Sequence, residues 1–318
     1  MTGSKYLVTG GAGFIGSHLV DQLLHHGEVV IIDNLYTGRL AGMRMNPDSS
    51  INEITCDLVK MMTGVSFHRR SILDVVGELF EGVDVVFHLA ALPRPQLSIK
   101  DPIPANHVNV DGTLNVLMKC KEHGVKRLVF ASSASVYGEQ EKYPTSETAK
   151  PNPMSPYAVQ KLVGEMYCRL FTEIYGVETN CLRLFNVYGS RMDPHGEYSS
   201  LIPKFIKLIE EGRRPTIFGT GEQRRDFVHV SDVVKAMELA AESEVYGEVF
   251  NVGYSVSYSV NQVFELICEM LGREVEPTHG PAVIEPTQTL ADIEKIRDVL
   301  GWEPRVNLER GLSETQWS

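Results

Sequence analysis

Apolar and polar positions along the first 130 residues predict alternating strands and helices. Short apolar runs predict buried strands over residues 6–9, 29–32, 85–87 and 128–130. Apolar residues at helical spacing predict helices over about 14–26 and about 109–123. Because the predicted strands are apolar throughout and alternate with helices, we expect an α/β fold built on a parallel, doubly wound sheet.

The second half of the chain is less regular. Pro151, Pro153 and Pro156 interrupt the pattern before a further helical stretch, and 277–286 is typical of a long surface connection. The length of the chain suggests two domains, or one domain with an elaborate appendage.

Composition indicates an ordinary globular enzyme. The chain has 318 residues, of which 43% are hydrophobic, and a net charge of −11, which argues against nucleic acid or an anionic membrane as a partner. No apolar run is long enough to span a bilayer. The five cysteines are scattered and lack metal-ligand spacing, so we expect no metal site, reduced thiols and a cytoplasmic location.

A glycine-rich turn follows the first predicted strand at Gly10, Gly13 and Gly16. Missing side chains allow backbone N–H groups at a helix N-terminus to approach a pyrophosphate, so the turn predicts nucleotide binding. Asp33 ends the next strand, where a carboxylate accepts hydrogen bonds from an adenosine ribose and repels a 2′-phosphate. NAD is therefore favoured over NADP, although Arg39 lies nearby.

Tyr157 and Lys161 are four residues apart, and positions i and i+4 share one face of a helix. An ammonium beside a phenol favours the phenolate, which can act as a base near neutral pH. Ser133 lies at the end of the 128–130 strand, where its hydroxyl could hold a substrate hydroxyl against that base. The alternative is a solvated surface pair, and the glycine turn favours the catalytic interpretation.

Two segments of the second half are candidate anion sites, since arginine chelates phosphate through its planar fork. Arg183 lies near the end of one predicted strand and Arg225 near the start of another, and a solvated arginine is the alternative for each. His88 and His229 have no visible acidic partner, so we expect His88 to be a packing residue at a strand end and His229 an ordinary strand residue.

Several ordered motifs together resemble the extended short-chain dehydrogenase/reductases, and within them the nucleotide-sugar 4-epimerases acting on UDP-glucose and its N-acetyl or uronate relatives. The motifs that carry the resemblance are Gly10–Gly16, Asp33–Leu35, His88–Ala91, Ser132–Gly138, Tyr157–Lys161, Arg183–Gly189, Arg225–Val230, Ala291–Asp292 and Gly301–Trp302. The resemblance implies a Rossmann-type NAD-binding domain over 1–182 plus 226–252. It also implies a smaller C-terminal α/β domain, over 183–225 plus 253–318, that binds the nucleotide sugar.

The resemblance also implies residue roles and partners. Catalysis is expected from Ser133, Tyr157 and Lys161. Tightly held NAD is expected to contact Gly10, Gly13, Phe14, Ile15, Gly16, Asp33, Asn34, Ser71, Ile72, Leu89, Ala90, Ala91, Asn109, Tyr157, Lys161 and Phe185. The UDP-sugar is expected to contact Ser133, Tyr157, Asn186, Ser200, Leu201, Arg225 and Val260. A homodimer is implied through a four-helix bundle of the tyrosine helix and a helix at about 100–122.

One comparison within the superfamily bears on the reaction, and two departures from the family pattern bear on binding. Dehydratases of this superfamily carry an Asp-Glu pair where this chain has Ala134 and Ser135, so epimerisation through a transient 4-keto sugar is favoured. An acidic residue is usual at Ser71, and an arginine that contacts the diphosphate is missing near Pro281. A UDP-glucuronate 4-epimerase, a nucleotide-sugar dehydratase or decarboxylase, a net oxidoreductase and a non-catalytic NAD-binding regulator remain alternatives.

Overall fold

The computed structural model of the chain describes residues 3–38, 64–93, 95–194, 200–283 and 285–317. The chain divides into two compact units. The first comprises Met1–Ser132, Ser155–Leu182 and Val234–Val249, and the second Ser133–Met154, Arg183–Val233 and Phe250–Ser318. Which unit binds NAD and which binds the sugar remains a prediction, as do the domain boundaries expected from the sequence.

A seven-stranded sheet forms the centre of the first unit. In spatial order its strands are β10 (Glu248–Val252), β6 (Glu178–Leu184), β5 (Arg127–Ser133), β4 (Val85–His88), β1 (Ser4–Thr9), β2 (Gly27–Asp33) and β3 (Val65–Arg69). β1 pairs in parallel with β2 and β4, β2 with β3, and β4 with β5. The strand order reverses between β1 and β4, which confirms the doubly wound parallel sheet.

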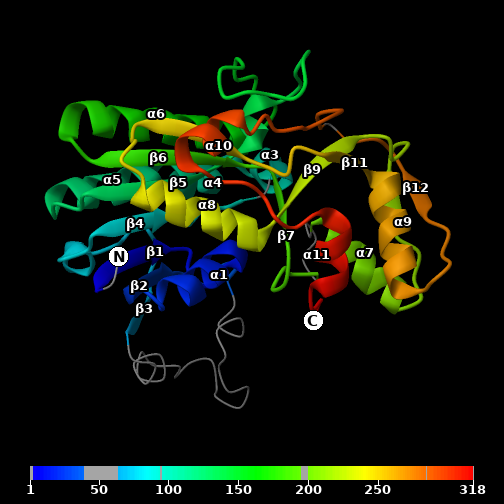
Figure 1. Cartoon of the computed structure of the whole chain (residues 1–318), viewed down its shortest axis with the longest axis horizontal. Helices are drawn as coiled ribbons and strands as arrows, with labels where there is room; N and C mark the ends of the chain where they lie inside the picture. Colours follow the sequence, from blue (N-terminus) through cyan, green and yellow to red (C-terminus); the bar gives the residue numbers. More distant parts are fainter. Residues whose placement is uncertain (1–2, 39–63, 94, 195–199, 284, 318) are drawn as a thin grey trace. The chain divides into compact units, whose positions relative to one another are not determined.

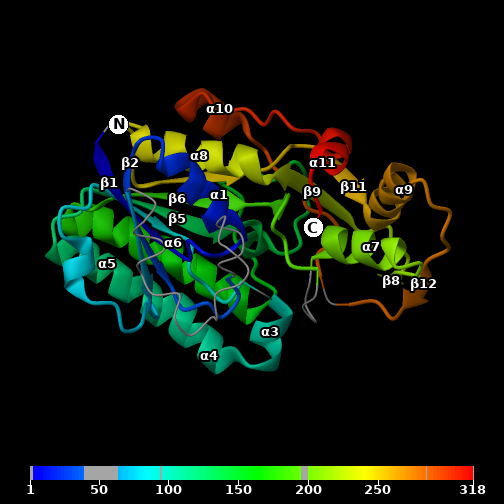
Figure 2. The same cartoon turned by 90° about the horizontal axis from the view of Figure 1, so that it is seen from below.

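Helices cover both faces of this sheet. Figures 1 and 2 show α5 (Gly112–Glu122) and α6 (Pro156–Tyr175) along one face, with α1 (Phe14–Leu23) and α8 (Val230–Glu242) along the other. Two short helices, α3 (Pro95–Lys100) and α4 (Pro102–Asn106), precede α5. The helix expected over about 109–123 is an α-helix only from Gly112, because a π-helical turn, η3 (His107–Asp111), precedes it.

The second unit contains two small sheets and four α-helices among its described residues. A three-stranded sheet has the order β11 (Ser257–Ser259), β9 (Arg224–His229), β7 (Asn186–Tyr188), and β12 (Thr278–Gly280) pairs with β8 (Thr216–Phe218). The helices are α7 (Leu201–Glu210), α9 (Val260–Leu271), α10 (Glu294–Leu300) and α11 (Leu308–Glu314). The interpretation of 277–286 as connection alone was incomplete, since β12 forms there through pairing with a distant strand.

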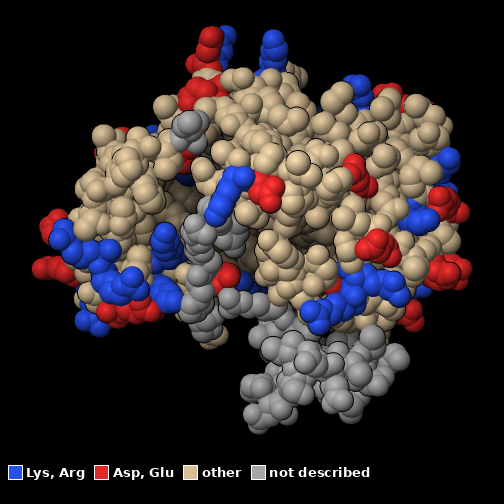
Figure 3. All heavy atoms as spheres, turned by 180° about the vertical axis from the view of Figure 1, so that it is seen from behind, with Lys and Arg blue, Asp and Glu red and all other residues tan. Residues whose placement is uncertain are grey.

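The face drawn in Figure 3 carries both acidic and basic side chains, with uncharged residues between them. None of the helices in the described ranges is long and apolar enough to cross a membrane. The same residues contain no group of three or more His, Cys, Asp or Glu side chains that could hold a metal ion.

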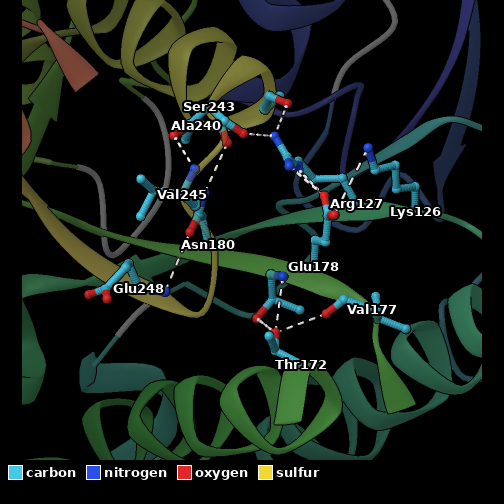
Figure 4. A network of polar contacts seen from close by, with 12 residues as sticks. Lys126, Arg127, Thr172, Val177, Glu178, Asn180, Ala240, Ser243, Val245 and Glu248 are labelled. Carbon is cyan, nitrogen blue, oxygen red and sulfur yellow. Dashed lines mark hydrogen bonds and ion pairs between the residues drawn. The ribbon is translucent and has the colours of Figure 1, made fainter. Parts of the chain in front are cut away.

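A polar network fastens the amino ends of β5 and β6 to the last turn of α8 and the segment after it (Figure 4). The buried guanidinium of Arg127 donates to the Glu178 carboxylate and to the carbonyl oxygens of Ala241 and Ser243. Asn180 donates to the carbonyl oxygens of Ala240 and Val245. These contacts lie at the amino ends of the strands, away from the carboxyl ends where ligands bind in such sheets, so their role is structural.

Candidate active site

The glycine turn between β1 and α1 is built for close backbone approach. Gly10 has a φ of +73°, and a Cβ placed there would lie 2.8 Å from the backbone nitrogen of Ala90. A Cβ on Gly16 would lie 2.1 Å from the carbonyl oxygen of Gly10. Gly13 is the N-cap of α1 and makes no side-chain cap hydrogen bond, so first-turn N–H groups can face an anion. The turn therefore fits a dinucleotide pyrophosphate.

Asp33 ends β2 beside this turn. Its carboxylate accepts hydrogen bonds from the N–H groups of Ala12 at 3.0 Å and Leu35 at 2.8 Å. Burial raises the pKa of Asp33, and the two N–H donors oppose that rise. Each carboxylate oxygen has a second lone pair for a ribose hydroxyl. Arg39, which argued for NADP, lies outside the described residues.

Tyr157 and Lys161 lie in the first two turns of α6, which begins at Pro156 after a Ser155 N-cap. Tyr157 is 7% exposed and Lys161 4%, so the pair is not a solvated surface pair. The ammonium nitrogen of Lys161 lies 5.9 Å from the Tyr157 ring centroid and donates to the carbonyl oxygen of Ala131 at 2.7 Å. Burial lowers the pKa of Lys161 to about 8.

Polar contacts hold this part of α6 in place. The N–H of Tyr157 donates to Ser98 Oγ at 3.0 Å, and Gln160 Oε1 accepts from Asn109 Nδ2 at 2.7 Å. One turn beyond Lys161, the buried carboxylate of Glu165 accepts a hydrogen bond from Ser132. Sequence reasoning missed Glu165, although its i+4 spacing from Lys161 was visible.

The segment after β4 carries three further predicted cofactor residues, Leu89, Ala90 and Ala91. The N–H of Leu89 donates to the Thr9 carbonyl oxygen at 3.1 Å, and that of Ala90 to Thr9 Oγ1 at 3.2 Å. Asn109, in η3, accepts from the N–H of Leu92 at 2.7 Å. The predicted nicotinamide side of the site is thus fastened to both β1 and η3.

The remaining predicted cofactor residues follow strands or open a helix. Asn34 follows β2 and accepts from the N–H of Tyr36. Ser71 and the buried Ile72 follow β3. Phe14 and Ile15 open α1, and Phe185 lies between β6 and β7 in the second unit. Their contacts with NAD remain predictions.

Ser133 is the last residue of β5 and the N-cap of a 3₁₀ turn, η4 (Ala134–Tyr137). Its Oγ accepts a hydrogen bond from the N–H of Ser135 at 3.2 Å, which fixes the side chain and leaves its hydroxyl proton to donate. Tyr137 at the end of the turn donates to Asn251 at 2.6 Å. The turn is therefore anchored within the second unit.

The two predicted arginines are buried rather than solvated. Arg183 lies over the Tyr137 ring, with its guanidinium carbon 4.7 Å from the centroid. Arg225 forms an ion pair with Glu285 at 2.7 Å. The Arg225–Glu285 pair was not foreseen, because the two residues are 60 positions apart in the chain.

Asn186 and the other predicted substrate residues begin elements of the second unit. Asn186 Nδ2 donates to the carbonyl oxygen of Asp226 at 3.0 Å. Leu201 and Val260 are the first residues of α7 and α9, and Ser200 is the exposed N-cap of α7. Their contacts with substrate remain predictions.

A glycine turn, an acid at the end of β2 and a buried tyrosine–lysine pair on a doubly wound sheet define a nicotinamide-dependent enzyme of the short-chain dehydrogenase/reductase class. A family model that matches this sequence identifies a narrower group within that class. The chain belongs to the NAD dependent epimerase/dehydratase family, whose model matches residues 6–253.

Similarity to two relatives extends over nearly the whole chain. A UDP-glucose 4-epimerase of Mycolicibacterium smegmatis is 38% identical, covering 98% of this chain and 97% of that protein. A UDP-glucuronic acid decarboxylase 1 of Xenopus tropicalis is 36% identical, covering 98% of this chain and 71% of that protein. The family therefore includes more than one reaction on UDP-sugars.

Solved structures show the same fold. The UDP-N-acetylglucosamine 4-epimerase of Methanobrevibacter ruminantium, in complex with UDP-N-acetylmuramic acid, is 36% identical with a TM-score of 0.91, covering 99% of this chain and 97% of that one. The Thermus thermophilus UDP-glucose 4-epimerase complex with NAD is 34% identical with a TM-score of 0.83, covering 98% and 97%.

Proposed function

We propose that this protein is an NAD-dependent 4-epimerase of UDP-hexoses, of the UDP-glucose and UDP-galactose type and extending to their N-acetyl forms. The buried Tyr157–Lys161 pair is the observation that carries the proposal, because it supplies a base next to a cationic group in an NAD-dependent family. Ala134 and Ser135 provide no carboxyl group after β5, which favours inversion over removal of water.

The chain's own residues have distinct roles in this reaction. Tyr157, as phenolate, removes the proton of the C4 hydroxyl, while the nearby Lys161 ammonium stabilises the phenolate. Ser133 donates a hydrogen bond that orients the same hydroxyl. When bound, NAD supplies the acceptor for the C4 hydride and the donor for its return. Tyr157 then reprotonates the oxygen of the 4-keto sugar once the sugar has turned.

Substrate must stay attached while the sugar turns, so binding must come from groups remote from C4. Arg225 and Asn186 are the proposed contacts of the diphosphate. Both are held by neighbours within the second unit, and Arg225 is 9% exposed. A fixed guanidinium costs less conformational entropy on binding than a free one.

Related reactions are the competing candidates. A UDP-glucuronate 4-epimerase uses the same C4 chemistry and differs only in the substrate. The Xenopus tropicalis relative favours decarboxylation, and Ala134 and Ser135 argue against dehydration. A net oxidoreductase would release NADH at each turnover.

One panel of substrates separates these reactions. Purified protein with NAD is incubated with UDP-glucose, UDP-galactose, their N-acetyl forms and UDP-glucuronate, and products are resolved by chromatography. We expect UDP-glucose and UDP-galactose to interconvert without growth of NADH absorbance. Steady NADH growth indicates a net oxidoreductase, a UDP-pentose indicates a decarboxylase, and either would overturn the proposal.

The epimerase is further proposed to be a homodimer through α6. Apolar side chains at helical spacing are exposed along it at Val159, Met166, Leu170 and Ile174. Light scattering after size exclusion is the test, with Met166→Glu as the variant. We expect the wild type to elute as a dimer and the variant to shift towards the monomer.

A further inference from the structure

His88, the last residue of β4, is fully buried and hydrogen-bonded on both ring nitrogens. Its Nδ1 lies 2.7 Å from Thr9 Oγ1, and its Nε2 lies 2.9 Å from Thr113 Oγ1. Thr113 Oγ1 is also 2.7 Å from the carbonyl oxygen of Asn109, and Thr9 Oγ1 accepts from the N–H of Ala90. Five residues, from β1, β4, η3, α5 and the segment after β4, thus form one continuous chain of hydrogen bonds.

The direction of this chain follows from its far end. The Asn109 carbonyl oxygen can only accept, so the Thr113 hydroxyl donates to it. Thr113 Oγ1 must then accept from His88, which places the ring proton on Nε2. With Nδ1 unprotonated, the Thr9 hydroxyl donates to it and accepts from Ala90. Reversing the ring would leave Thr113 and Asn109 with two facing oxygens and no proton between them.

The charged ring is disfavoured by the same surroundings. Burial and, to a lesser extent, the nearby Lys161 ammonium lower the pKa of His88 to about 3. A proton on Nδ1 would also remove the acceptor of the Thr9 hydroxyl. The ring therefore stays neutral and keeps one tautomer at physiological pH.

Both ends of this series of hydrogen bonds reach predicted cofactor residues. Thr9 directly precedes Gly10, and it binds Ala90 through its hydroxyl. The Asn109 side chain holds Leu92 and contacts Gln160, one turn after Tyr157 on α6. A shift at His88 would thus be transmitted to the glycine turn, the 89–92 segment and the tyrosine helix.

We propose that His88, as the neutral Nε2–H tautomer, is a positioning residue that fixes the Ala90 and Asn109 segments relative to each other for NAD binding. The interpretation of His88 as a packing residue was therefore incomplete. The proposal rests on the proposed function only in taking Ala90 and Asn109 as cofactor contacts, and it is independent of the sugar.

Three variants separate the contributions of the two hydrogen bonds that the His88 ring makes. His88→Asn keeps an acceptor towards Thr9, His88→Gln keeps a donor towards Thr113, and His88→Phe keeps the ring and neither bond. His229→Asn is the control, because His229 ends β9 in the second unit and bonds Ser231. NAD affinity is measured by calorimetry on full-length protein freed of cofactor, without any sugar.

We expect His88→Phe to weaken NAD binding about tenfold or more, with Asn and Gln between it and wild type, and no change for His229→Asn. Unchanged NAD affinity in a folded Asn or Gln variant, with only a lower Tm, would overturn the positioning role.

Nitrogen NMR of the wild-type protein tests the tautomer directly. We expect the His88 ring to show a protonated Nε2 and an unprotonated Nδ1 from pH 6 to 8. A protonated Nδ1, or titration within that range, would overturn the proposal even if the protein proves to be an epimerase. Conversely, failure of every UDP-sugar to react would leave both measurements interpretable.

Discussion

The ammonium nitrogen of Lys161 donates a hydrogen bond to the carbonyl oxygen of Ala131, at 2.7 Å. This bond ties the second turn of α6 to the end of β5, two residues before Ser133. The Lys161 ammonium is thereby held against β5, the strand that ends at the predicted Ser133, and its charge has a fixed position inside the first unit. The predictions that follow depend on that placement.

Replacing Tyr157 by phenylalanine removes the proposed base and keeps the ring. We expect the epimerisation rate to fall by ~10²–10⁴-fold, with NAD still bound, because general acid–base groups contribute that much. Tyr246→Phe is the matched control, since Tyr246 is exposed in a loop of the same unit. Near-full activity of the Tyr157 variant would show that another group is the base.

The buried Lys161 predicts a pH dependence of stability. Its pKa is about 8 in the folded protein and 10.5 ordinarily, so between these values the unfolded chain binds more protons. Stability of the wild type should therefore rise from pH 8 to 10.5, relative to Lys161→Met, by at most about 3 kcal/mol. Denaturant unfolding of both proteins across this range is the measurement, and parallel curves would refute the prediction.

Arg225 is the proposed diphosphate contact. Arg225→Ala should weaken UDP binding by ~10–100-fold, because a charge-assisted hydrogen bond contributes about 1.5–3 kcal/mol. NAD affinity should be unchanged, since the proposed cofactor turn lies in the other unit. Calorimetry with UDP and with NAD separates the two effects. Arg214→Ala, which removes an exposed arginine of the same unit, is the control.

Arg127 gives a prediction about stability alone. Arg127→Ala removes a buried guanidinium, leaves the half-buried Glu178 carboxylate without that partner and should cost about 3 kcal/mol in the free energy of unfolding. The neighbouring Lys126→Ala is the control, because Lys126 is exposed and 3.9 Å from Glu178. Equal stabilities of the two variants would contradict the structural role given to Arg127.

Much of the fold was predictable because its signals are local. Apolar runs mark the buried strands, and glycines mark the turn at Gly10–Gly16, so the parallel sheet and the cofactor turn follow from neighbouring residues. The strand β12 was missed because it has only three residues and forms through pairing with β8, 62 residues away. Short strands of this kind depend on tertiary contacts rather than on their own sequence.

The site was predictable in its residue types and less so in its contacts. Spacing puts Tyr157 and Lys161 on one face of a helix, and only burial distinguishes a site from a surface pair. The partners of His88 are Thr9 and Thr113, which are 79 and 25 residues away. No local pattern indicates that a strand-end histidine will be bonded on both nitrogens.

The first unit is assembled from three separate stretches of the chain, and the last of them ends at Val249. During synthesis, β5 and β6 leave the ribosome before the carbonyl groups of Ala241 and Ser243 exist to meet Arg127. β10 also arrives after them, so the outer edge of β6 stays uncovered until then. The first unit therefore cannot complete its folding before its last stretch has been synthesised. We expect newly made chains to depend on chaperones until about residue 249 has emerged from the ribosome.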